Sequence, residues 1–259
     1  MSKFNIKKVA FPPEHGSWGF VIEPLLLSLL VAYSQIGLML VVAAFFIFLN
    51  HQPVRVLLNK KKRTQFLWKA LFFFFFYSFV ILISLYIVLT NTAFQNLLPF
   101  DFAILLMFIF FLLEIMQNGR KLFAEFIAPL AITFIALSVV LINGWNIYST
   151  IAFAVILLGR AIPTVLYVNV KVQFLKGNKV SKIPFYLAEL LLLVIGIYLI
   201  FLGLIPKLSL IAMSLLIARA EYGLAKTNLS ENVKTLGIKE FIFGILYVII
   251  IFIGYSFNL

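Results

Sequence analysis

Three polar segments interrupt an otherwise apolar chain, and each holds side chains that could bind an anion or move a proton. The first, near residues 12–24, contains His15 and Glu23. Histidine titrates near neutral pH and a carboxylate can accept a proton, so we expect this pair to act in acid–base chemistry. The alternative is that His15 caps a turn and that Glu23 neutralises nearby basic residues.

The second polar segment, near residues 50–64, contains Asn50, His51 and Arg55. Arg55 offers a planar fork of donors that suits a phosphate or carboxylate. We therefore expect Asn50 and Arg55 to bind substrate and His51 to act as a proton donor. The lysines at 60–62 are more typical of a topology anchor, which would attract anionic phospholipid headgroups.

The third polar segment, near residues 159–182, places Arg160 and Pro163 inside an apolar stretch. An arginine within a membrane helix marks a functional site by default, and Pro163 frees a backbone carbonyl one turn away. We expect Arg160, Tyr167, Asn169 and Lys171 to bind substrate.

Other charges lie near the ends of apolar stretches, among them Glu114, Glu125 and Glu189. Together with Glu23 and Arg160 they predict a polar cavity that faces the cytoplasm; the alternative is charge neutralisation at the lipid boundary. We interpret the segments around Arg219 and Glu240 as local ion pairs. The spacing of histidines and carboxylates favours no metal site, and the sequence predicts no cofactor, with Mg²⁺ as the alternative.

The composition indicates the class of protein to which these polar segments belong. Of 259 residues, 64% are hydrophobic and only 12% are charged, whereas a soluble domain carries about 25% charged residues. The chain is therefore predicted to be an all-α membrane protein in a single domain. The net charge of +12 is interpreted as a topology signal, and no nucleic-acid partner is expected.

Nine apolar segments are long enough to be interpreted as membrane helices. They are 18–33, 37–49, 67–89, 102–116, 123–142, 149–168, 183–203, 208–220 and 241–257. With the N-terminus inside, 20 of the 21 lysines and arginines fall on the cytoplasmic side and only Lys207 falls outside. This asymmetry predicts a multi-pass protein of the cell membrane with its N-terminus inside and its C-terminus outside.

The motifs resemble those of the YwiC-like bacterial membrane proteins. The resemblance rests on Pro13-x-His15-Gly16-x-Trp18, on Arg160-x-x-Pro163-Thr164-x-x-Tyr167 and on Leu175-Lys176-Gly177, and it runs over most of the chain.

More distantly, the layout is similar to the UbiA superfamily of intramembrane prenyltransferases. That resemblance implies a bundle of nine helices around a cavity open to lipid, with polar motifs after the second and sixth helices. The family's Asp-rich metal motifs are missing: aligned on Asn50, the aspartate positions hold His51, Val54 and Leu58. An enzyme with this fold would thus be a transferase without the usual metal site.

We therefore expect the chain to bind or modify an isoprenoid or another amphiphile with an anionic or quinone head. Two alternatives remain: a transporter or permease for a small anion or lipid, and an accessory membrane subunit without chemistry of its own. Membrane lipid is the expected partner in the first case.

Overall fold

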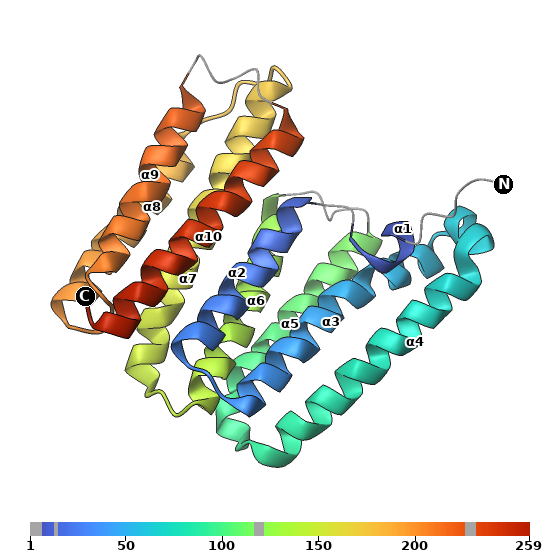
Figure 1. Ribbon diagram of the computed structural model, residues 1–259. Coiled ribbons are helices and arrows are strands. Elements are labelled where there is room, and N and C mark those ends of the chain that lie inside the picture. The colour runs from blue at the N-terminus through green and yellow to red at the C-terminus, as the bar shows by residue number, and fades with distance from the viewer. Residues whose placement is uncertain (1–6, 13–14, 117–121, 226–231) are drawn as a thin grey trace.

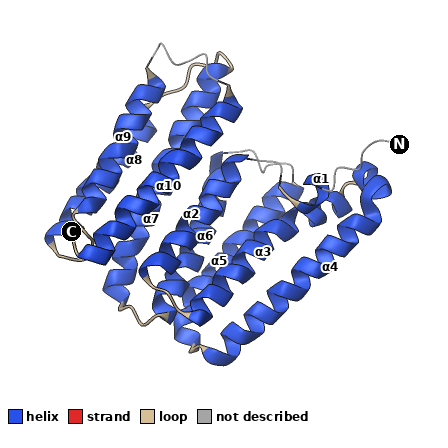
Figure 2. Cartoon of the chain, in the orientation of Figure 1, coloured by secondary structure: helices blue, strands red, loops and turns tan. Residues whose placement is uncertain are grey.

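The computed structural model describes residues 7–12, 15–116, 122–225 and 232–259, and within these ranges it contains helices and loops but no β-strand (Figure 2). Its ten helices are α1 (Lys7–Ala10), α2 (His15–Val31), α3 (Gln35–Leu58), α4 (Lys60–Asn91), α5 (Phe94–Ile115), α6 (Leu122–Ile142), α7 (Ile147–Leu175), α8 (Ile183–Phe201), α9 (Leu208–Leu224) and α10 (Val233–Phe257).

The long helices form two layers (Figure 1). One layer runs α9, α10, α2, α3 and α4, and the other runs α8, α7, α6 and α5, with each helix packed on its neighbour in the layer. Contacts of α2 and α3 with α6, and of α10 and α9 with α7, join the layers. The short helix α2 therefore lies between the two halves of its layer, next to both α10 and α3.

Each of the nine apolar segments predicted from the sequence overlaps one helix from α2 to α10, but several helices extend further. The second segment was expected to end at Leu49, whereas α3 continues to Leu58; the sixth was expected to end at Val168, whereas α7 continues to Leu175. The predicted ends were wrong because hydropathy falls where polar residues begin, while backbone hydrogen bonding continues. Residues 50–58 and 169–175, which were expected in loops, therefore form the last turns of α3 and α7.

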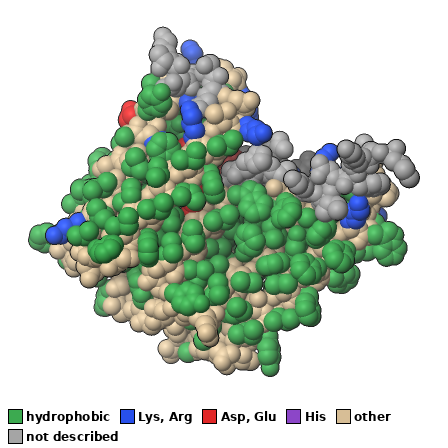
Figure 3. Space-filling model, in the orientation of Figure 1, with side chains coloured by type: hydrophobic (Ala, Val, Ile, Leu, Met, Phe, Trp, Pro, Cys, Tyr) green, Lys and Arg blue, Asp and Glu red, His purple; other side chains and the backbone are tan. Residues whose placement is uncertain are grey.

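The bundle has the surface of a membrane protein. In the part of the chain that the structure describes, seven helices are long and apolar enough to cross a bilayer: α3, α4, α5, α6, α7, α8 and α10. Hydrophobic side chains cover the flank visible in Figure 3, and the lysines and arginines seen there gather mostly at the end that carries α1 and the α7–α8 connection. The C-terminal Leu259 lies at the other end, where its carbonyl accepts a hydrogen bond from the Leu208 amide.

The packed interior lies at the junction of α2, α6, α7, α9 and α10. Phe153 on α7 is completely buried there, and its ring lies 5.7 Å from that of Trp145 and 6.1 Å from that of Tyr255, both measured between centroids. Since lipid is as apolar as these side chains, the gain comes from close packing rather than from escape from water.

Replacing Phe153 with alanine should lower the stability of the bundle by roughly 3 kcal/mol, because it leaves a cavity among fixed neighbours. Phe75, whose side chain is 64% exposed on α4, is the matched control, and Phe75→Ala should change stability little. Thermal unfolding in detergent measures both. Equal losses in the two variants would contradict this assignment of the core.

Candidate functional site

A buried ion pair joins α2 to α7. The Nε of Arg160 lies 3.0 Å from Oε2 of Glu23, and its Nη2 lies 3.3 Å from the other carboxylate oxygen. The same Nη2 donates to the backbone carbonyl of Glu240 at 2.9 Å, and Nη1 donates to the hydroxyl of Thr164. Every guanidinium nitrogen of Arg160 thus has a protein partner.

A second ion pair continues the first into α9 and α10. Arg219 Nη1 lies 2.6 Å from Oε2 of Glu240, and that oxygen is 3.7 Å from Nη1 of Arg160. The guanidinium of Arg219 also lies over the ring of Tyr167, 4.5 Å from its centroid. Glu23, Arg160, Arg219 and Glu240, here called the four-charge cluster, are only 4–7% exposed. Their formal charges sum to zero.

The sequence places one wall of the site on a single face of α7. Arg160, Thr164, Tyr167 and Lys171 are spaced by four, three and four residues, the spacing that aligns side chains on one side of a helix. Arg160 is 13 residues from the start of α7 and 15 from its end, so it lies about 20 Å from either end. Arg160 therefore lies near the middle of α7.

Two glycines make room for the carboxylate on α2. A Cβ on Gly244 of α10 would overlap the carboxylate of Glu23, and a Cβ on Gly19 would meet its Oε1. The absence of side chains at these two positions allows α10 to approach α2 with a charged group between them.

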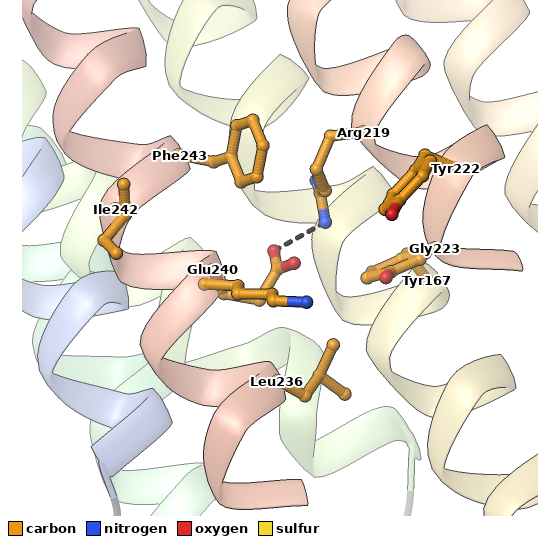
Figure 4. Close-up of a pocket in the computed structure, with 9 residues that line it drawn as sticks. Tyr167, Arg219, Tyr222, Gly223, Leu236, Glu240, Ile242 and Phe243 are labelled. Atoms are coloured by element: carbon orange, nitrogen blue, oxygen red, sulfur yellow. Dashed lines mark hydrogen bonds and ion pairs between the residues drawn. The ribbon is translucent and has the colours of Figure 1, made fainter. Parts of the chain in front are cut away.

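A cavity of about 270 Å³ lies beside the cluster, between α7, α9 and α10. In Figure 4 the guanidinium of Arg219 and the carboxylate of Glu240 point toward one another in its wall. The other lining residues are mostly apolar or aromatic: Tyr167, Tyr222, Gly223, Leu236, Lys239, Ile242 and Phe243. The arrangement thus places a small polar region within apolar walls.

The structure brings together three of the four residues predicted on α7. Arg160 belongs to the cluster, Tyr167 lines the cavity, and Lys171 is completely buried with its Nζ 2.5 Å from the carbonyl of Gly223 in the cavity wall. Asn169 is half-buried on α7. The roles of these residues in substrate binding stay predictions.

The residues predicted on α3 lie in another part of the bundle. Asn50 donates to the hydroxyl of Ser78 on α4 at 3.1 Å, and the His51 ring lies 6.3 Å from that of Phe110 on α5. Arg55 is half-buried in the last turn of α3. His15 begins α2, but its side chain lies outside the described part of the chain, as does that of Glu114.

Arg219 and Glu240 are site residues that were not predicted from the sequence to belong to the site. The sequence predicted local ion pairs within each of the two segments, whereas the structure pairs Arg219 with Glu240 across α9 and α10, in a buried position next to Arg160. Arg219 lies in register with Ala212 and Leu216 on the buried face of α9, a spacing of four and three that could have revealed its burial. Within the described residues, no three His, Asp or Glu side chains come together in a way that could hold a metal.

Breaking the Glu23–Arg160 pair should be more harmful than removing it. Arg160→Met leaves two buried carboxylates with one guanidinium and should cost about 3–5 kcal/mol of stability. The double variant with Glu23→Leu leaves the balanced Arg219–Glu240 pair and should recover at least half of that loss. A double-mutant cycle of thermal unfolding in detergent measures the coupling. Strictly additive losses would contradict the pairing.

Comparison with known families identifies the family of this chain. The model of the family described as YwiC-like protein matches residues 11–140, which are 130 of the 259 positions. The match includes Glu23 and ends within α6, so α7 to α10 lie beyond it. No curated protein and no solved structure matches the chain. The chain belongs to the YwiC-like family.

Proposed function

We propose that this protein binds a membrane amphiphile by its polar head, in the cavity between α7, α9 and α10. The observation that carries the proposal is the juxtaposition in one cavity wall of the Arg219–Glu240 pair with aromatic and apolar side chains. A ligand site typically combines such walls with a few placed polar groups. An amphiphile is the class of molecule that offers both kinds of surface.

The size of the cavity favours a head group over a whole lipid. Its volume of about 270 Å³ lies just below the roughly 300–1,000 Å³ of pockets that enclose a drug-sized ligand. Ile242, which lines the cavity, is 53% exposed on the flank of α10. A hydrocarbon tail can therefore leave along this flank while the head stays inside.

The contacts support a ligand-binding role for Arg219 rather than for Arg160. All nitrogens of Arg160 have protein partners and none of its atoms is among those that line the cavity. Arg219, by contrast, belongs to the cavity wall. Arg160 acts in this proposal as the group that holds Glu240, and through it Arg219, in position.

The orientation follows from the distribution of charge. The cavity residues Tyr222, Gly223 and Lys239 lie near the α9–α10 connection, at the end that the basic residues predict to be cytoplasmic. We propose that α2 to α10 all cross the membrane, with α2 and α9 as the short spans. An arrangement like that of the UbiA superfamily stays a prediction from the sequence motifs, as do the anionic and quinone heads.

A carrier is the second candidate, and the position of the four-charge cluster favours it. Buried ion pairs that link four helices deep in a bundle are typical of transport pathways. In this case the cluster would exchange partners as the helices move, and the amphiphile or a small anion would cross the membrane rather than remain bound.

The proposed topology can be tested directly because the sequence contains no cysteine, so that one introduced thiol reports one site. Cysteine at Lys179, between α7 and α8, should resist a membrane-impermeant maleimide in intact cells, and cysteine at Gly203, between α8 and α9, should react. Permeabilised cells provide the control, in which both should react. The reverse pattern would place the cavity on the outer face.

The binding site is tested by filling it. Leu236→Trp places a larger side chain against the cavity and should weaken retention of added amphiphiles at least tenfold. Leu246→Trp, on the exposed flank of the same helix, should leave retention unchanged. Native mass spectrometry with geranylgeraniol, geranylgeranyl phosphate, dioleoylglycerol and dioleoylphosphatidate measures the occupancy.

If Leu236→Trp does not fold, Leu236→Phe takes its place. Absence of binding for the whole panel in the wild-type protein would overturn the proposal. Binding that the two tryptophan variants weaken equally would place it outside this cavity.

A further inference from the structure

We infer that the head group bound in this cavity is neutral and carries a hydroxyl, as in a long-chain alcohol or a diacylglycerol, rather than a phosphate. The inference rests on the proposed function and narrows its ligand class. It departs from the sequence-based expectation of an anionic head, because the structure adds a carboxylate to the cavity wall.

Glu240 and Arg219 neutralise one another in the wall. Their side chains are 2.6 Å apart and are nearly completely buried. Lys239 provides the remaining positive charge among the lining residues, and it is exposed, so water and salt screen it. An anion that enters the cavity thus meets a neutral pair with a carboxylate in it, not an uncompensated arginine.

Both members of the pair also have an atom without a hydrogen bond. Within the described part of the chain, Oε1 of Glu240 and Nε of Arg219 are buried and have no partner. One is an acceptor that lacks a donor, and the other is a donor that lacks an acceptor. Leaving such atoms unpaired costs about 1–3 kcal/mol each, and more when the group is charged.

A hydroxyl is the simplest group that can pair with both members of the ion pair that lines the cavity. Its hydrogen can be donated to the carboxylate while its oxygen accepts from the guanidinium. A phosphate dianion or a quinone carbonyl only accepts, and an ammonium only donates, so each could pair with only one of the two side chains. A dianion would in addition be repelled by Glu240.

Two pairs of lipids that differ only in the phosphate test the inference. Geranylgeraniol is compared with geranylgeranyl phosphate, and dioleoylglycerol with dioleoylphosphatidate, by native mass spectrometry of the wild-type protein. In each pair the alcohol should bind about tenfold more tightly, the factor expected from one hydrogen bond to a charged group. The two pairs also distinguish an isoprenoid alcohol from a glycerolipid as the source of the hydroxyl.

The variant Glu240→Gln tests whether the negative charge of Glu240 disfavours a phosphate. It keeps an oxygen for Arg219 but removes the negative charge, so the preference should shift toward the phosphate by about tenfold or more. Lys239→Gln is the matched control: it removes a charge of opposite sign from the same wall and should shift the preference the other way or leave it unchanged. If Glu240→Gln does not fold, Glu240→Asp, which keeps the charge, should keep the preference for the alcohol.

Tighter binding of either phosphate by the wild-type protein would overturn the inference while leaving the proposed function intact. The same holds if the preference is unchanged in Glu240→Gln. Absence of binding for all four lipids would instead overturn the proposed function itself, so the two failures are distinguishable.

Discussion

The structure depends on balancing charge where there is no water to solvate it. Four ionised side chains, from α2, α7, α9 and α10, lie together in the buried part of the bundle. An unpaired charge in such a place costs several kcal/mol, so each partner constrains the positions of the others. The glycines at positions 19 and 244, the polar face of α7 and the close approach of α10 to α2 all serve this requirement.

The same requirement shapes the cavity. Arg160 uses its whole guanidinium on protein partners, which fixes the backbone of α10 through the carbonyl of Glu240. Glu240 in turn holds Arg219 across from it, and Tyr167 supports the guanidinium from one face. The ion pair that lines the cavity thus also holds α9 and α10 together, which explains how polar side chains are accommodated among apolar walls.

The sequence predicted the helices well, because nine apolar runs with basic residues in alternate connections leave little choice of fold class. It predicted Glu23 and Arg160 as charges that need a reason to be in a membrane helix, but it did not pair them. They are 137 positions apart, and nothing in either segment specifies the other. Arg219 and Glu240 looked like ordinary helix-end charges, since the apolar runs end at 220 and begin at 241, whereas α9 continues to Leu224 and α10 begins at Val233. The grouping of Asn50, His51 and Arg55 with Arg160 followed from the analogy of layout, whereas in the structure Asn50 contacts Ser78 of α4 and His51 lies beside Phe110 of α5.

The position of α2 has a consequence for how the protein is made. This helix is synthesised before α7 and α10, yet it packs against α10 and its carboxylate pairs with an arginine on α7. While the ribosome is still producing the helices in between, Glu23 has neither. Until α7 has been made, this carboxylate has no arginine to balance it, and an unpaired charge is costly in apolar surroundings. The packing of α2 is therefore completed only after α10 has been synthesised.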